Sequence, residues 1–292
     1  MKKKNPLIFL HLTRTGGSTL RGIIERQINR GAAYRIKGNS IEKTIEDFKN
    51  FSQVERDKIK FLSGHMPLGL HKYFSVPCDY ITMLRDPIEK VISEYYYMKN
   101  FPQHTYYQTI KNMSLKDHAL SRVNSVVNYQ ARVLSDNWGM PHVESSPLPS
   151  NALEVAKENL RKYFKVVGVM EKFDETLLVF KKVLGWKNIY YIRNNVNAKR
   201  PLKSEISQDV LDIIKKNNAL DIELHKLAGQ LLEDSIKKYG PSFEEDLKRF
   251  RVINKTNFFQ TLNTVKGKSR EFIVNCIPDF VKNRIKKVLN KN

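Results

Sequence analysis

The chain has 292 residues, of which 41% are hydrophobic and 10% aromatic, which is enough for a sizeable core in one large domain or two small ones. Its 51 Lys and Arg residues outnumber its 30 Asp and Glu residues, and the net charge of +21 favours anionic ligands, polyanions or membrane surfaces as partners. No apolar run is long enough to span a bilayer or to form a secretory signal, so we expect a cytoplasmic protein.

Five short segments rich in β-branched and aromatic residues predict strands, with amphipathic segments between them. The predicted strands are residues 7–12, 59–62, 80–84, 165–169 and 188–192. Short apolar strands that alternate with helices indicate an α/β fold, in which a central parallel sheet is covered by helices on both faces.

The first two helices have clear starting signals. One follows two glycines, and its apolar stripe consists of Leu20, Ile23, Ile24 and Ile28. The next follows residue 84, because Asp86 is a good N-cap, Pro87 suits the first helical position and Glu89 stands three residues after the cap. Further helices are predicted over residues 108–135, 151–164, 171–186, 207–217 and 221–239.

The charge and composition change near Asp246, which predicts a domain over residues 1–246 and a basic helical extension over residues 247–292. Residues 248–292 contain 12 Lys and Arg against Glu271 and Asp279, a net charge of +10. A basic amphipathic segment, “FVKNRIKKVLNKN”, suits peripheral contact with the inner face of an anionic membrane, and a solvated helix or packing on the body are alternatives. No recognition motif accompanies the charge, so we expect no nucleic acid partner.

The opening stretch “LIFLHLTRTGGSTL” is typical of a strand, a glycine turn and a helix that together hold a phosphate or sulfate group. Gly16 and Gly17 allow the backbone to approach an anion, Ser18 and Thr19 offer hydroxyl groups, and Arg14 supplies a full charge. An ordinary loop with a helix cap explains the same letters. A P-loop nucleoside triphosphatase is excluded, because no Lys follows the last glycine.

A second motif, “YITMLRDPIEKVISEYYY”, offers another anion site. Arg85 ends a predicted strand, where open α/β sheets bind their ligands, and Ser93 lies about two turns into the helix that follows. Alternatively, Arg85 forms an ion pair with Asp86, and Ser93 is a hydroxyl group on the helix surface.

Together these motifs resemble those of sulfotransferases that use 3′-phosphoadenosine 5′-phosphosulfate (PAPS), closest to the carbohydrate 2-O-sulfotransferase-like branch. “FLHLTRTGGSTL” resembles the 5′-phosphosulfate loop, and “LRDPIEKVISEYYY” the 3′-phosphate motif. “FLSGHMPLGL”, “NYQARVL”, “VVGVMEKFDETL” and “NNVNAKRP” follow in the order of the family, so the resemblance covers residues 7–233. It implies a P-loop-like central parallel sheet flanked by helices.

The resemblance also implies that PAPS binds across the carboxyl ends of the strands and leaves as adenosine 3′,5′-bisphosphate. The residues that match the 5′ loop are Arg14, Thr15, Gly16, Gly17, Ser18 and Thr19. Arg85 and Ser93 match the pair that binds the 3′-phosphate. Lys199 and Arg200 match a loop that closes over the nucleotide, and a solvated basic turn is the alternative.

Two catalytic residues follow from the resemblance. Arg14 stands where the family usually has Lys, and a guanidinium cannot readily release a proton, so we expect it to stabilise the charge of the leaving group. His65 matches the catalytic histidine and implies a general base, with a structural histidine as the alternative. His11 is expected to pack within the fold, His71 is a second candidate base, and Glu171 also matches a family position.

The transfer is expected to be an in-line displacement without a metal ion. The two cysteines, Cys78 and Cys276, are too far apart in the sequence to suggest a metal site or a disulfide framework.

The acceptor is expected to be a hydroxyl group of a carbohydrate or glycoconjugate. The carbohydrate branch favours this, as does a segment whose side chains suit sugars, namely Tyr106, Tyr107, Asn128, Tyr129, Arg132 and Trp138. Half-buried helices explain the same composition. A P-loop-type small-molecule kinase and a catalytically degenerate protein that binds membranes or polyanions are the alternative functions.

Overall fold

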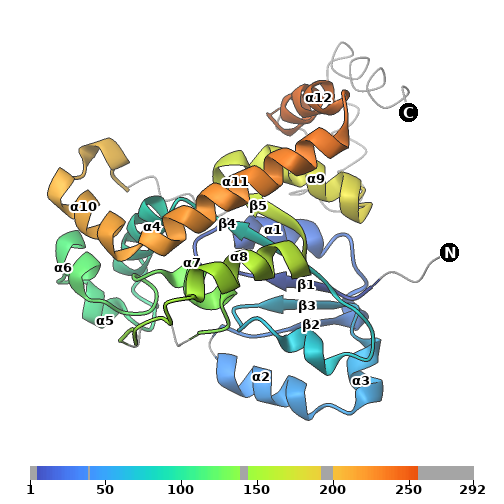
Figure 1. Ribbon diagram of the computed structural model, residues 1–292, viewed down its shortest axis with the longest axis horizontal. Helices are drawn as coiled ribbons and strands as arrows, with labels where there is room; N and C mark the ends of the chain where they lie inside the picture. Colours follow the sequence, from blue (N-terminus) through green and yellow to red (C-terminus); the bar gives the residue numbers. More distant parts are fainter. Residues whose placement is uncertain (1–4, 39, 139–143, 192–199, 256–292) are drawn as a thin grey trace, which may run out of the picture.

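The computed structural model describes residues 5–38, 40–138, 144–191 and 200–255. Within these residues five parallel strands form one sheet in the order β2-β3-β1-β4-β5 (Figure 1). The strands are β1 (Leu7–Leu10), β2 (Ala33–Arg35), β3 (Phe61–Gly64), β4 (Asp79–Leu84) and β5 (Phe164–Val169). The α/β fold with a parallel central sheet is therefore confirmed.

Helices surround this sheet and form a separate group at one end of it. They are α1 (Gly17–Ile24), α2 (Ile41–Asn50), α3 (Gln53–Lys58), α4 (Pro87–Lys99), α5 (Tyr107–Ile110), α6 (Leu115–Leu120), α7 (Tyr129–Leu134), α8 (Ala152–Tyr163), α9 (Phe173–Leu184), α10 (Gln208–Asn217), α11 (Ala219–Tyr239) and α12 (Phe243–Lys255). Figure 1 shows α2 and α3 beside the β2 edge, α11 along the β5 side, and α4, α5, α6 and α10 grouped at one end.

The helix that carries the second motif begins as its sequence predicts. The side chain of Asp86 accepts a hydrogen bond from the backbone N–H of Glu89 at 2.9 Å, and Pro87 occupies the first helical position. A carboxylate at this end also interacts favourably with the helix dipole. This cap fixes where α4 leaves the end of β4, and so where Ser93 lies.

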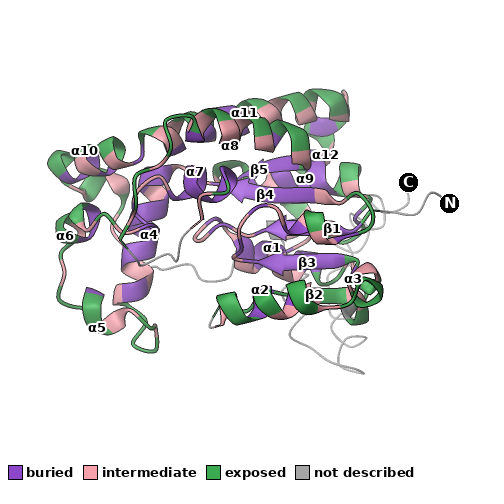
Figure 2. Cartoon of the chain, turned by 60° about the horizontal axis from the view of Figure 1, so that its bottom comes forward, coloured by how far each residue is buried: buried purple, intermediate pink, exposed green. Residues whose placement is uncertain are grey.

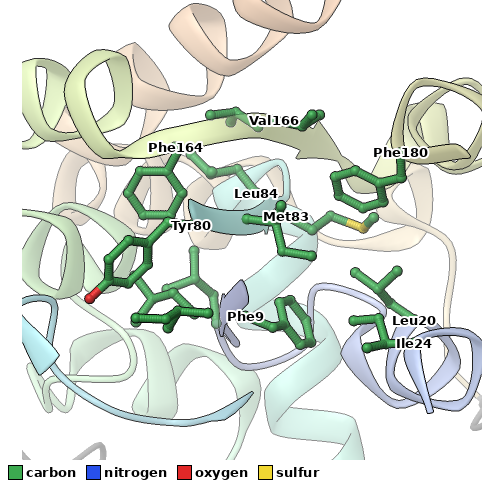
Figure 3. Close-up of a cluster of buried hydrophobic side chains, with 14 of the residues drawn as sticks. Phe9, Leu20, Ile24, Tyr80, Met83, Leu84, Phe164, Val166 and Phe180 are labelled. Carbon is green, nitrogen blue, oxygen red and sulfur yellow. The ribbon is translucent and has the colours of Figure 1, made fainter. Parts of the chain in front are cut away.

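The core lies between the sheet and the helices that cover it. Figure 3 shows Phe9 of β1 beside Leu20 and Ile24 of α1, and Met83 of β4 beside Phe180 of α9. All five side chains are buried. Figure 2 shows the central strands buried, whereas β2 is largely exposed at the edge. Strands β1 and β4 are thus part of the buried core, and these two strands precede the two anion motifs.

One predicted strand is wrong and one strand was not predicted. Residues 188–191 form no strand, because side chains satisfy their backbone groups: Gln27 donates to the carbonyl oxygen of Asn188 at 2.6 Å, Arg26 donates to that of Tyr190, and the N–H of Tyr191 donates to Asn254 at 3.0 Å. The missing member of the sheet is β2, a three-residue edge strand.

The chain remains helical across the expected boundary at Asp246. Helix α12 covers this position, and its residues Phe243, Leu247 and Phe250 are each 4% exposed. The ring of Phe250 stacks on that of Tyr190 with a centroid distance of 5.6 Å. Packing on the body therefore continues past residue 246, while the expected membrane contact of residues 256–292 lies outside the described part.

No helix in the described part of the chain combines the length and the hydropathy that a bilayer crossing requires.

Candidate active site

The candidate site lies where the parallel strands end. We call this the carboxyl edge of the sheet; it is formed by the last residues of the strands, Leu10, Arg35, Gly64, Leu84 and Val169. Because the strands are parallel, the segments that follow them meet along one line. His11 follows β1, His65 follows β3, Arg85 follows β4, and Glu171 lies just after β5.

The loop after β1 is tightly packed at its two glycines. Gly16 has a φ of 77°, in the left-handed region, and a Cβ atom there would overlap Met170. A Cβ atom on Gly17 would overlap the ring of His11. The first turn of α1 contains no acidic residue. Glycine is therefore required for the close packing of this loop, and the positive end of the helix dipole is not neutralised by a carboxylate on its own first turn.

The three hydroxyl residues among residues 14–19, which match the 5′ loop, differ in their exposure. Thr15 is fully buried and donates its hydroxyl proton to the carbonyl oxygen of Leu12 at 2.9 Å, so its side chain braces the loop from inside. Thr19 is buried, at 9% exposure. Ser18 is only partly buried, at the second position of α1. Of the three hydroxyl groups, that of Ser18 is the most accessible to an anion.

The two predicted anion motifs meet at Arg14. Its Nε donates to the hydroxyl of Ser93 at 3.2 Å, and its carbonyl oxygen accepts from the guanidinium of Arg85 at 2.9 Å. Its guanidinium lies 4.2 Å from the ring centroid of Tyr97, a cation–π contact one turn beyond Ser93. Arg14 itself has a φ of 59°. The structure thus brings Arg14, Arg85 and Ser93 into one cluster.

Arg85 is held by contacts that the sequence did not reveal. Gln130 accepts from the backbone N–H of Arg85 at 3.0 Å and donates to its carbonyl oxygen at 2.9 Å. The backbone N–H of Gln130 donates in turn to the buried carboxylate of Asp221 at 3.0 Å. Gln130 belongs to the “NYQARVL” segment, so the family motif was the signal that could have identified it. We infer that Gln130 fixes the end of β4, from which the Arg85 side chain projects.

Arg200 joins the cluster through a shared carboxylate. Glu89 accepts from Arg85 at 3.3 Å and also from Arg200, and the three side chains are 15% to 23% exposed. We call Arg14, Arg85 and Arg200 the cationic cluster. Burial lowers the pKa of Arg85, the charge of Arg200 lowers it further, and Glu89 raises it. Lys199, the other predicted residue of this loop, lies outside the described residues.

The buried Nε of Arg85 has no hydrogen-bond partner within the described part of the chain. Buried donors are normally satisfied, so an anionic ligand is a suitable partner for this group. The residues present therefore fit a phosphate-bearing nucleotide.

Glu171 ties this edge to α11. Its carboxylate accepts from the backbone N–H of Asp86 at 3.0 Å and lies 3.1 Å from Nε2 of His225. These contacts support the start of α4, which is a structural role beside the cluster.

His65 has the tautomer that a general base needs. Its Nδ1 lies 2.6 Å from the carbonyl oxygen of His11, which can only accept, so Nδ1 carries the proton and Nε2 keeps its lone pair. The His65 ring stacks on that of His11 at 4.3 Å. Burial lowers the pKa of His65, so the ring stays neutral near pH 7.

The other two histidines have different surroundings. His11 lies between Phe9 and His65, with a ring centroid 5.2 Å from that of Phe9, and contacts Gly17, as expected of a packing residue. His71 lies 3.1 Å from the hydroxyl of Tyr80, near the amino end of β4. Since the cationic cluster is at the carboxyl end, His71 is the weaker candidate base.

A comparison with known protein families decides the class of protein. Residues 2–262 match the galactose-3-O-sulfotransferase family. The chain belongs to this family. The match confirms the sulfotransferase recognised from the motifs, and it places the chain in a galactose-3-O branch rather than in the 2-O branch that the motifs resembled most.

A comparison with solved structures also found matches. The sulfotransferase is similar to mouse sulfotransferase SULT7A1 complexed with PAP, with 11% sequence identity and a TM-score of 0.38, over 87% of this chain and 85% of that one. Curated proteins include no match to the sequence.

The sulfotransferase is thus an enzyme of the PAPS-dependent class. Across the described residues, no group of three or more His, Cys, Asp or Glu side chains could hold a metal ion.

The residues suggested for acceptor binding divide into two sets. Tyr129 and Arg132 are 2% and 3% exposed, and the side chain of Asn128 accepts from the backbone N–H of Leu220 at 3.0 Å. The prediction that Tyr129 and Arg132 belong to an acceptor surface is therefore wrong, because both side chains pack inside the sulfotransferase. Tyr106, in contrast, is partly exposed and lies in an aromatic group near Arg14.

Proposed function

We propose that the enzyme transfers the sulfuryl group of PAPS to a hydroxyl group of a galactose-containing carbohydrate, with His65 as the general base. The observation that carries this proposal is the contact of Arg14 with both Ser93 and Arg85. Two motifs that lie some seventy residues apart thereby form one cationic site on the carboxyl edge, next to strand β3, which His65 follows.

The donor side follows from the charges. The backbone N–H groups at Gly17 and Ser18 and the guanidinium of Arg14 suit the phosphosulfate, whereas Arg85 and Ser93 suit the 3′-phosphate. In the transfer, the sulfur forms a bond to the acceptor oxygen as its bond to the 5′-phosphate oxygen breaks. That oxygen leaves with the electron pair, and the fixed guanidinium of Arg14 stabilises its charge.

The acceptor hydroxyl gives its proton to Nε2 of His65, whose neutral ring is oriented by the hydrogen bond from Nδ1–H to the carbonyl oxygen of His11.

An aromatic group beside Arg14 suits the flat faces of a sugar ring. Tyr97 stacks on Phe101 at 5.7 Å and meets His104 edge-on at 5.5 Å. Phe101 is 42% exposed, so part of this apolar surface faces solvent.

Turnover with labelled PAPS and methyl β-galactopyranoside tests the reaction. His65→Ala should lower kcat by about 100-fold or more, the usual contribution of a positioned base, while adenosine 3′,5′-bisphosphate binds nearly as before. His71→Ala is the matched control and should keep its activity. An unchanged rate in His65→Ala would remove His65 from the mechanism.

Titration calorimetry separates this function from that of a kinase. The enzyme should bind adenosine 3′,5′-bisphosphate and should not require Mg²⁺. Tight binding of ATP with Mg²⁺, without binding of the bisphosphate, would overturn the proposal.

A further inference from the structure

The carboxyl edge continues beyond His65 to β2. Arg35 is the last residue of β2 and pairs in register with Ser63, two residues before His65. The N–H of Ile36 donates to the carbonyl oxygen of Ser63 at 2.8 Å. Arg35 therefore lies on the side of His65 that is away from the cationic cluster, because β3 separates β2 from β1 and β4.

Gly64 makes this approach possible. It has a φ of 148°, and a Cβ atom on it would lie 2.7 Å from Cβ of Ile36, which is too close for any other residue. Ile36, which follows Arg35, therefore lies against Gly64, which precedes His65. The His65 imidazole and the Arg35 guanidinium are thus carried by neighbouring parts of the backbone.

A second arginine approaches the same histidines from α1. Arg21 lies one turn after Gly17, which packs on His11, and His11 stacks on His65. Burial is the main cause that lowers the pKa of His65. The hydrogen bond to the carbonyl oxygen of His11 and the charge of Glu94 raise it, and the charges of Arg35 and Arg21 lower it. The two guanidiniums also act on each other, since Arg21 adds to the burial that lowers the pKa of Arg35.

Within the described residues, carboxylates neutralise the charges of Arg21 and Arg35 only in part. Arg21 lies 3.6 Å from Glu25, and these side chains are 30% and 44% exposed, which makes the ion pair weak. Among the described residues, Arg35 has no ion-pair partner within 4.0 Å. Glu25 therefore faces two guanidiniums, and Glu94, which also acts on His65, is paired with Lys90 at 2.5 Å, so an excess positive charge remains beside the proposed base.

We propose that the acceptor sugar carries an anionic group close to its accepting hydroxyl, and that Arg21 and Arg35 bind this group. The inference rests on the proposed function, in which His65 receives the proton of that hydroxyl. A guanidinium matches the oxygens of a carboxylate or sulfate ester with two parallel hydrogen bonds. Positive charge at this point also offsets the repulsion between an anionic acceptor and the anionic donor.

Three sugars that differ only at C6 test the proposal: methyl β-galactopyranoside, its C6 carboxylate (the uronide) and its 6-sulfate. With saturating PAPS, the wild-type enzyme should show a kcat/KM at least about 10-fold higher for one anionic sugar than for the neutral one. That preference should fall to within about 2-fold in Arg35→Gln and should decrease in Arg21→Gln. Arg161→Gln, an exposed position of α8, is the matched control and should leave it unchanged.

The outcomes separate this inference from the proposed function. A preference for the uronide indicates an acidic sugar, and a preference for the 6-sulfate indicates a sugar that is already sulfated. Transfer to the neutral sugar with no anionic preference, or a preference that Arg35→Gln leaves intact, overturns the inference alone.

Absence of transfer to all three sugars counts against the proposed function. Binding of the same sugars to enzyme saturated with adenosine 3′,5′-bisphosphate, followed by ligand-observed NMR, then decides the inference. Equal signals from the three sugars, or signals that Arg35→Gln leaves unchanged, overturn it.

Discussion

Replacing Arg85 with Ala should selectively remove the recognition of the 3′-phosphate. The Arg85 side chain is 15% exposed, and its Nε is buried without a partner in the described residues. A hydrogen bond to a charged group contributes about 1.5 to 3 kcal/mol, which corresponds to a Kd about 10- to 150-fold weaker. Because the site is mostly shielded from water, we expect a value in the upper half of this range.

Titration calorimetry with two nucleotides measures this effect. Adenosine 3′,5′-bisphosphate and adenosine 5′-monophosphate differ only in the 3′-phosphate. Arg85→Ala should weaken the binding of the bisphosphate by the factor above and that of the monophosphate by less than about 3-fold. Arg161→Ala, on the exposed face of α8, is the control and should change neither.

The same pair of nucleotides can refute the reasoning. Arg85 also donates to the carbonyl oxygen of Arg14, so its loss could loosen the loop after β1. In that case both nucleotides would lose affinity by the same factor. An equal loss would show that Arg85 supports the loop and does not face the 3′-phosphate.

Three further predictions concern the loop and two histidines. Because burial lowers the pKa of His65 below its ordinary value of 6.5, the ring stays neutral, and kcat/KM should remain level as the pH falls to about 6.5; a decline that begins above pH 7 would contradict this. Gly17→Ala places a methyl group on the ring of His11 and should lower the free energy of unfolding by about 1 to 3 kcal/mol in urea, whereas Gly22→Ala, with open space around it, should be neutral or stabilising. Burial lowers the pKa of His118 to about 4, against 6.5 in the unfolded chain, so the unfolded chain binds more protons between these pH values. The free energy of unfolding should therefore fall by up to about 3 kcal/mol as the pH drops from about 6.5 to about 4. Urea unfolding of His118→Phe should lack this contribution to the pH dependence.

The helices and strands that the sequence predicted best are those that depend on residues close together in the chain. The start of α4 depends on Asp86 and Pro87, which act within one turn, and the structure has this cap. Strands β1, β3, β4 and β5 are apolar runs that are buried wherever the sheet forms. Their predicted positions overlap the observed ones, with differences at the ends.

The errors came from contacts between distant segments. Strand β2 has only three residues, and it is a strand because it pairs with β3. Residues 188–191 contain strand-forming side chains, but Gln27 and Arg26 bind their carbonyl groups from more than 160 residues earlier in the chain. Local composition carries no information on either arrangement.

The same division holds for the site. Arg14, Arg85 and Ser93 stand in motifs whose spacing suits an anion, and the structure places them in contact. Gln130 and Tyr97 act only through the positions of α7 and α4, which the fold determines. Their roles could not be obtained from spacing along the chain.

The strand order has a consequence for how such an enzyme can change. Segments after β1, β4 and β5 surround the cationic cluster, whereas β2 and β3 lie on the far side of β1. Substitutions around Arg35 can therefore alter which acceptor is sulfated and leave the nucleotide-binding residues unchanged. Selection can therefore vary Arg35 while it keeps Arg14, Arg85 and Ser93 unchanged.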